Sequence, residues 1–341
     1  GSITNGQGFL ISPEEAKDLI QGNKLNKQVL YPYLAGEDIT SSPEQEPSRW
    51  AINFKDYPLD AEHDSSTKPK GPPFARDYPS CLRILEEKVK SERLSKSEDV
   101  AKAPWWQFWR YRAELYRRIS NEEKVLVRAR TSNMHAMVFV PNGWIYNENV
   151  IVFANCSFTV LQSNIHEVWA RLRSGSMRAD MQYTPQKCFE TFPFPNNIEP
   201  LENLGESYHS HRQFIMSSRQ EGLTETYKHF HDPTQTDPDI QTLRDLHIQM
   251  DTAVAAAYGW HDLTLNHDFH ETKQGLRFTI SEGDRREVLD RLLELNHQRY
   301  AEEVAQGLHD KKKGKGKKGK QKKQAPKKTQ QQSDSVQGSL F

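Results

Sequence analysis

Apolar residues recur at helical spacing near the middle of the chain and predict an amphipathic helix over residues 158–173. Its apolar stripe consists of Val160, Leu161, Ile165, Val168, Trp169 and Leu172. Basic and small hydroxyl residues gather where this helix ends, namely Arg171, Arg173, Ser174, Ser176 and Arg178. Guanidinium groups beside hydroxyl donors are typical of a phosphate-binding loop, although an ordinary solvated turn has the same composition.

Short β-branched and aromatic runs between residues 124 and 160 predict a β-meander, with turns near residues 133, 141–143 and 147–149. Polar side chains at these turns are candidate base-reading groups, because arginine pairs with guanine and asparagine with adenine in the major groove. The candidates are Arg128, Arg130, Ser132, Asn133 and His135, with Asn147 and Asn149 second. For each of them, an ordinary polar residue of a turn or edge strand is an equal alternative.

Three elements are predicted before residue 100. Ser12 and Glu15 have the spacing of a capping box, and Pro13 suits the first helical position, so a helix should run from there to about Gly22. Residues 50–54 alternate apolar and polar side chains and predict a half-buried strand. Prolines and charges make residues 58–80 a surface loop, and residues 81–97 have a helical pattern.

Aromatic residues alternate with arginines over residues 104–119, in the sequence PWWQFWRYRAELYRRI. Arginines of such a segment suit contacts to DNA phosphates, with one or two rings at the edge of the duplex. We therefore predict phosphate contacts from Arg110, Arg112 and Arg117. Trp106 and Trp109 are expected in the hydrophobic core, because tryptophans at helical spacing are usually packing residues.

The sequence pattern changes after residue 195, where three helical segments are expected before a Lys-, Gly- and Gln-rich tail. We predict an α+β protein with three parts: a mixed α/β domain with a β-meander at 1–195, a helical domain at 196–309, and a disordered basic tail at 310–341. A tail of this composition adds non-specific affinity for a polyanion at most.

The formal net charge of zero results from cancellation between parts of the chain. The tail from residue 311 holds eleven lysines and one aspartate, whereas residues 196–310 hold ten basic and 21 acidic residues. Residues 101–195 are basic, with twelve lysines and arginines against seven carboxylates. A polyanion is therefore expected to bind to residues 101–195, and the acidic part that follows is a poor DNA surface.

Several other chemistries find little support in the sequence. The three cysteines are far apart, no apolar run reaches the length of a membrane span, and no signal peptide is visible, so a reduced cytoplasmic protein is expected. Histidine pairs such as His267 and His270 lack the Cys or carboxylate partners of a zinc site. In the segment GPPF, Gly71 has no side chain to accept a hydrogen bond from a target amino group.

The segment LQSNIHEVWARLRSGSMRADMQYTPQKCFETFPFP resembles the end of the target recognition domain of single-chain adenine DNA methyltransferases. These include type IIG and IIL restriction–modification enzymes and methyltransferases of BREX- and DISARM-like phage defence systems. The matching residues are Leu161, Ser163, His166, Trp169, Tyr183, Thr184, Phe189, Phe192, Pro193, Phe194 and Pro195. The segments VLYPYLAGEDI and SRWAINF near the start of the chain, and the YGW and LLELN words near its end, resemble the same family.

This resemblance implies sequence-specific recognition of double-stranded DNA without catalysis by this chain. S-adenosylmethionine and the Asn-Pro-Pro-Tyr/Phe motif are then expected in an amino-terminal methyltransferase domain that the chain lacks, in a parent protein with or without a fused endonuclease. The predicted phosphate contacts are Arg110, Arg112, Arg117, Arg171, Arg173, Ser174, Ser176, Arg178 and Tyr183. No metal is expected. The alternative is a stand-alone interaction subunit that docks other defence-system proteins.

Overall fold

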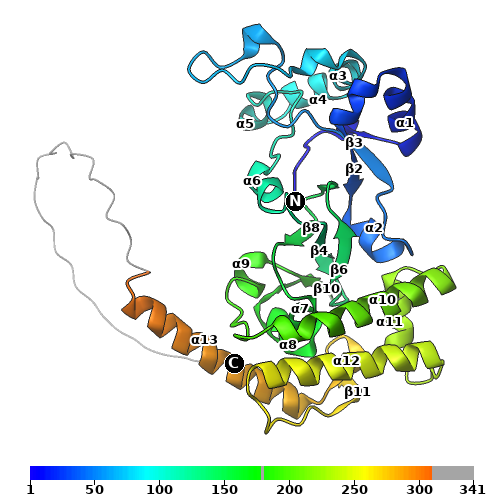
Figure 1. The fold of residues 1–341 in the computed structure, drawn as a ribbon, viewed down its shortest axis with the longest axis vertical. Helices are drawn as coiled ribbons and strands as arrows, with labels where there is room; N and C mark the ends of the chain where they lie inside the picture. The colour runs from blue at the N-terminus through cyan, green and yellow to red at the C-terminus, as the bar shows by residue number, and fades with distance from the viewer. Residues whose placement is uncertain (178–179, 309–341) are drawn as a thin grey trace, which may run out of the picture. The chain divides into compact units, whose positions relative to one another are not determined.

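The computed structural model describes residues 1–177 and 180–308, and the side chains of residues 176 and 177 are left aside (Figure 1). Contacts between residues group Gly1–Gln298 into one compact unit. The described residues 299–308 fall outside this unit. The predicted tail at 310–341 lies outside the described residues.

The first sheet has the strand order β1-β3-β2-β7, in which β7 runs parallel to β2 and the other pairs are antiparallel. Its strands are β1 (Leu10–Ile11), β2 (Leu30–Leu34), β3 (Arg49–Ile52) and β7 (Ile145–Tyr146). Helices α1 (Pro13–Gly22), α2 (Gly36–Ser41), α3 (Pro79–Leu85), α4 (Ser91–Leu94) and α5 (Glu98–Ala101) accompany it, with a π-helical turn at Glu86–Lys90. The predicted capping box is confirmed, because the Glu15 amide donates to Ser12 Oγ and the Ser12 amide to Glu15 Oε2.

The predicted β-meander is confirmed in part. Strands β6 (Val138–Pro141), β4 (Lys124–Ala129) and β8 (Val150–Phe153) form an antiparallel sheet in that order. The remaining run supplies β7 and joins the first sheet, because Tyr146 is needed beside Leu34 of β2. A third, small sheet consists of β5 (Thr131–Ser132), β10 (Asp180–Gln182) and β9 (Gly175–Met177). Of two short helices, α6 (Ala113–Arg118) precedes these strands in the sequence and α9 (Pro185–Cys188) follows them.

The predicted helix over residues 158–173 consists of two helices, α7 (Phe158–Gln162) and α8 (Asn164–Arg173). Ser163 separates them in an extended conformation, and its Oγ accepts a hydrogen bond from the His166 amide as the N-cap of α8. The apolar stripe is buried as predicted except at Leu172, which is 51% exposed at the last turn. The segment therefore carries a buried face that ends where its basic residues begin.

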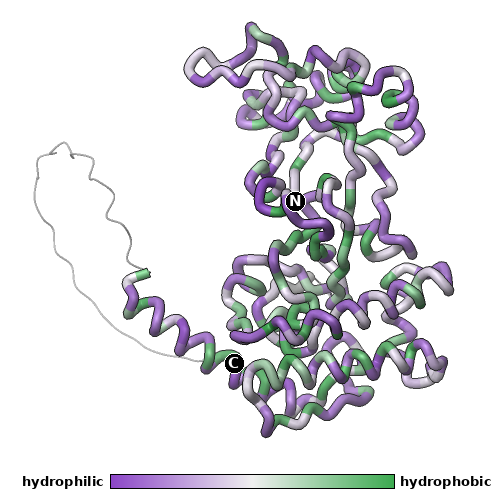
Figure 2. Tube along the Cα trace, in the orientation of Figure 1, coloured by the Kyte–Doolittle hydropathy of each residue, from purple (hydrophilic) through white to green (hydrophobic). Residues whose placement is uncertain are grey.

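The chain after residue 195 contains α10 (Glu202–Arg219), α11 (Leu223–His231), α12 (Pro238–Ala257) and α13 (Glu282–Ala305). The first predicted helix of this part is in fact α10 and α11, because Gln220 has a left-handed φ of 53° and ends α10. An antiparallel hairpin of β11 (His267–Thr272) and β12 (Gly275–Ile280) was not expected. The alternation on both sides of Gly275, whose φ is +91°, was a usable signal for it. In Figure 2 apolar and polar segments alternate along these helices, as expected for amphipathic elements.

The hydrophobic core continues across residue 195. Tyr208 and Ile215 of α10 belong to the same buried cluster as Val127 of β4 and Leu161 of α7. Fully buried Arg212 of α10 donates to Gln162 Oε1, the Tyr227 hydroxyl and the Met137 carbonyl. The predicted boundary at 195 is therefore no division between compact units, because α10 completes the core of the meander.

Gly222 offers a test of this packing. A Cβ atom at this residue would lie 2.5–2.7 Å from backbone atoms of Ser41, which have no flexible side chain to move aside. Gly222→Ala should therefore lower the free energy of unfolding by about 1–3 kcal/mol in urea denaturation. Gly22→Ala, where nothing lies within 4 Å of the added atom, is the matched control and should leave stability nearly unchanged. Equal stability of both variants would contradict the close contact of α11 with α2.

Candidate nucleic-acid interface

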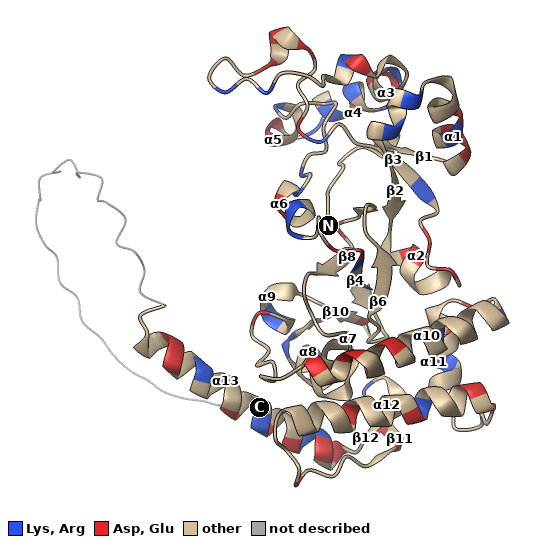
Figure 3. Cartoon of the chain, in the orientation of Figure 1, with Lys and Arg blue, Asp and Glu red and all other residues tan. Residues whose placement is uncertain are grey.

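Four exposed arginines form an arm before and within α6, which we call the arginine arm: Arg110, Arg112, Arg117 and Arg118. The arm is fixed by the first residues of the chain, because the Ile3 amide donates to the Arg110 carbonyl at 2.9 Å and the Arg110 amide to the Ile3 carbonyl at 3.0 Å. The Arg110 guanidinium stacks on the Trp109 ring at 4.3 Å. Figure 3 shows Lys and Arg positions on α6, near the amino terminus of the chain. The backbone of the arm is therefore fixed by hydrogen bonds, and its arginine side chains present positive charge to the solvent.

The arginine arm lies close to the turn at residues 147–149. The Ser2 amide donates to the Tyr146 carbonyl at 2.7 Å, and Ser2 pairs with Asn147 in a parallel bridge. Ser2 Oγ donates to the Tyr111 carbonyl at 2.7 Å, so Ser2 joins this turn to the backbone of the arm. Arg130 is tied to the turn, since its Nε donates to the Glu148 carbonyl at 2.8 Å and its amide to the Asn149 carbonyl at 2.7 Å. The arm and the turn thus belong to one surface.

Within this turn the two asparagines have different roles. Asn147 Oδ1 accepts from the Asn149 amide at 2.6 Å, and Asn147 Nδ2 donates to the Tyr33 hydroxyl at 2.7 Å. Both ends of the Asn147 amide are thus used within the protein, so it shapes the turn and is a poor candidate for reading a base. Asn149 is exposed and remains a candidate.

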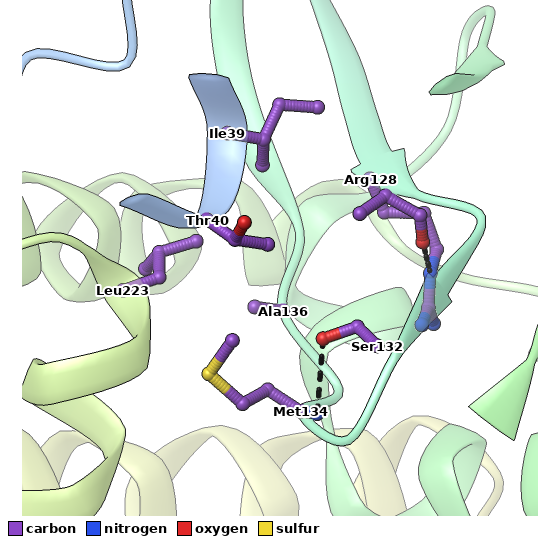
Figure 4. Close-up of a pocket in the computed structure, with 8 residues that line it drawn as sticks. Ile39, Thr40, Arg128, Ser132, Met134, Ala136 and Leu223 are labelled. Carbon is purple, nitrogen blue, oxygen red and sulfur yellow. Dashed lines mark hydrogen bonds between the residues drawn. The ribbon is translucent and has the colours of Figure 1, made fainter. Parts of the chain in front are cut away.

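A second turn follows β5 and presents the exposed residue Asn133. Ser132 Oγ accepts from the Met134 amide at 3.1 Å, and the Asn133 carbonyl accepts from Arg171 Nη2 at 3.2 Å. Figure 4 shows the packed crevice beside it, which has no room for a water molecule and is lined by residues of α2, β4, the turn and α11. Ser132 therefore supports the turn, and Asn133 is the side chain that faces outward.

The basic residues at the end of α8 are partly engaged within the protein. The Arg171 guanidinium is paired with Glu167 of the preceding turn at 2.6 Å. The Arg173 guanidinium stacks on the Trp169 ring at 4.6 Å. Ser174 ends the helix, its amide donating to the Ala170 carbonyl at 2.8 Å. Arg178 and the side chain of Ser176 lie outside the described residues, so these two predicted contacts stay predictions.

Three predicted contact residues are buried: Arg128, His135 and Tyr183 are 1%, 4% and 0% exposed. Arg128 Nη1 donates to His135 Nδ1 at 3.1 Å, and the guanidinium lies 4.4 Å from the Tyr183 ring centre. Side chains without exposed surface do not reach a duplex that binds at the protein surface. Their burial argues against the predicted base and phosphate contacts, and we assign all three to the core.

The same burial explains several residues of the recognised motif. His166 Nε2 and the Tyr183 hydroxyl are 3.0 Å apart, and the His166 ring meets Phe192 edge to face at 4.5 Å. Trp169 is fully buried beside Phe192. The motif thus specifies a packed core beneath the exposed turns, because its large side chains contact one another.

Within the described part of the chain, no group of three or more His, Cys, Asp or Glu side chains is arranged to hold a metal ion. His267 instead contacts the buried carboxylate of Asp251 at 2.7 Å, and that carboxylate also accepts from the amide and side chain of Asn164. Among the described helices none is long and apolar enough to cross a membrane.

The comparisons with known proteins agree with one another. Residues 1–196 match the family described as MmeI, target recognition domain. A solved structure of the type IIL restriction–modification enzyme MmeI in complex with DNA is similar at a TM-score of 0.59 and 18% identity, over 88% of this chain and 35% of that chain. The chain thus spans about a third of that enzyme, and the likeness shows a shared fold. No curated protein sequence matches.

Acid should destabilise the core, because burial lowers the pKa of five histidines, that of His209 and His231 to about 3. The five are His135, His166, His209, His231 and His247. Below about pH 6.5 the unfolded chain binds more protons than the folded one, so the free energy of unfolding should fall by up to about 1.4 kcal/mol per pH unit per histidine.

Urea denaturation between about pH 7 and pH 5 measures this slope, in a range above the titration of most carboxylates. His209→Gln removes one titrating group and should make the slope shallower. A free energy of unfolding that stays constant over this range would contradict the burial of neutral histidines.

Proposed function

The chain belongs to the MmeI target recognition domain family, and on this premise we propose that it recognises a DNA sequence for a restriction–modification enzyme. The observation that carries the proposal is that arginines accompany two turns with exposed asparagines: the exposed arginine arm is joined through Ser2 to the turn of Asn149, and Arg171 is bonded to the turn of Asn133. Charge supports it as well, because residues 101–195 are the basic part of the chain outside the tail. Polyanion affinity and base reading require these two features together.

In the proposed mechanism the arginine arm binds phosphates and sets the register of the protein on the duplex. Arg110, Arg112 and Arg117 are exposed, so each guanidinium reaches a phosphate without first losing a protein partner that is buried with it. Arg171 and Arg173 add charge at the end of α8. These contacts are the same for every sequence and supply affinity rather than specificity.

Base reading is assigned to the exposed turns. Asn133 and Asn149 present side-chain amides that suit bidentate contacts to adenine, and Arg130 stands beside Asn149 with a guanidinium that suits guanine. The backbone hydrogen bonds of both turns fix the positions of the Cα atoms that carry these side chains. A base change opposite one of them should therefore alter affinity by about 1–3 kcal/mol.

The chemistry is assigned to a part of the parent protein outside this chain. We propose an adenine-specific DNA methyltransferase as the parent, in a restriction–modification or phage-defence system of the cytoplasm, with S-adenosylmethionine bound by its methyltransferase domain. The segment GPPF does not fit this role here. Gly71 offers only its amide, which donates to Asp64 Oδ2 at 2.8 Å, and no side-chain acceptor for an adenine amino group.

Substituting two residues of the arginine arm should weaken binding to all duplexes alike. Arg112→Gln with Arg117→Gln removes two phosphate contacts, so the slope of log K against log salt should become shallower by about 1.8. Fluorescence anisotropy with unrelated duplexes over a salt series measures this. Lys102→Gln, at an exposed lysine paired with Glu98, is the control and should keep the wild-type slope. No affinity of the wild-type chain for DNA would overturn the proposed function and favour the interaction-subunit alternative.

Asn133→Ala should change which sequences are bound. Its side chain is exposed and its backbone carbonyl, which holds Arg171, is kept, so the fold should be unaffected. Selection from a randomised duplex pool should enrich a motif with the wild-type chain and show one relaxed base position with the variant. Gln220→Ala, at an exposed residue of the acidic part, is the control. An unchanged motif would remove Asn133 from the proposed base readers.

A further inference from the structure

The unexpected hairpin β11–β12 brings an additional cation to α8. Thr279 Oγ1 of β12 donates to Asn164 Oδ1 at the start of α8 at 3.0 Å. Alternate residues of a strand share a face, so the Arg277 side chain leaves β12 on the same side as Thr279. Two strand residues cover roughly 6.6 Å and a helix rises about 1.5 Å per residue, which brings Arg277 alongside the part of α8 that follows Asn164.

Electrostatic effects on Arg277 identify its neighbours on α8. Burial is the largest cause that lowers the pKa of Arg277, and charge repulsion from Arg171 lowers this pKa as well. Attraction to Glu167 raises it. Glu167 and Arg171 follow Asn164 by three and seven residues and so lie on the same helix face. Together with the bond from Thr279 to Asn164, these effects put Arg277 on the side of α8 that carries Glu167 and Arg171, and Arg171 in turn holds the Asn133 carbonyl.

The one carboxylate of this part of α8, that of Glu167, is paired among the described residues with Arg171 alone. Arg171 already pairs with Glu167, through Nε at 2.7 Å and Nη2 at 2.6 Å. Within the described residues, the Arg277 guanidinium has one hydrogen bond, from Nη1 to the Leu276 carbonyl at 3.3 Å, and no ion pair. His231 adds no charge, since its pKa is about 3 and its Nδ1 accepts from the Phe278 amide at 3.2 Å. The site thus has an uncompensated positive charge.

The hairpin holds this charge firmly in place. Phe278 is buried against Phe230 of α11, and the Arg244 guanidinium lies over the Phe269 and Phe278 rings. His267, on the paired strand, is tied to Asp251 of α12. A rigidly placed cation next to another cation is unfavourable unless an anion joins them, and a phosphate accepts bidentate hydrogen bonds from arginine.

We propose that Arg277 of the hairpin and Arg171 of α8 together bind one phosphate of the duplex beside the Asn133 turn. The helical part, acidic as a whole, thereby contributes a contact to the DNA interface from outside the 1–196 family match. This inference rests on the proposed function and adds to it a specific residue.

The test compares salt dependence in the full chain, using a fluorescein-labelled duplex of mixed sequence. Arg277→Gln and Arg171→Gln should each make the slope of log K against log salt shallower by about 0.9, and the double variant by the same about 0.9, because one phosphate is lost in each case. Arg286→Gln, at an exposed arginine paired with Glu282, should keep the wild-type slope. Arg277→Lys retains the charge, so it should keep the slope while weakening binding, which separates charge loss from misfolding.

A wild-type slope for Arg277→Gln would overturn the inference while leaving the proposed function in place. A double variant whose slope changes by about 1.8 would also overturn it, because the two arginines would then bind separate phosphates. A wild-type chain without affinity for DNA would overturn the proposed function and this inference together.

Discussion

The buried guanidinium of Arg128 is the interaction on which the candidate interface depends. Burial lowers its pKa to about 10, so it keeps its charge at neutral pH, and no ion pair to it occurs among the described residues. It is held by the Tyr183 ring, His135 Nδ1 and the Ala129 carbonyl. A buried charge is costly unless every neighbour is placed to stabilise it. Since these neighbours come from β4, from the segment before β6 and from the residue after β10, Arg128 fixes these elements relative to one another.

The residues around Arg128 connect these elements to the helices through further hydrogen bonds. His135 Nε2 contacts the Leu161 carbonyl at 2.6 Å, and so its proton lies on that nitrogen while Nδ1 accepts from Arg128. Tyr183 leads to His166 of α8. From α7 the network continues through Gln162 to Arg212 of α10. The family match ends at residue 196, yet the core it specifies is closed by α10 and α11. The helical part is thus needed for the stability of the recognition part.

Local chemistry was predictable where it depends on near neighbours in the sequence. The Ser12 capping box, the buried stripe of α8 and the strands of the meander follow from spacing alone. The predicted phosphate contacts required exposed arginines before α6, and Arg110 and Arg112 are exposed. Burial of Arg128, His135 and Tyr183 did not, since it results from contacts between residues up to 55 apart and polar side chains in a strand give no sign of direction. The hairpin at 267–280 was not predicted, although the alternation on both sides of Gly275 was a signal for it.

The small sheet that supports the Asn133 turn has strands of only two or three residues. The exposed side chains of this sheet and its turn bury little apolar area, and the sheet itself has few backbone hydrogen bonds. These side chains therefore contribute little to stability. Stability instead resides in the network below, with Arg128 and the aromatic residues around it. Selection for a folded protein and selection for a particular contact surface therefore act on different residues. The contact surface of this chain can therefore be changed by substitution at little cost in stability, provided that the network around Arg128 is kept.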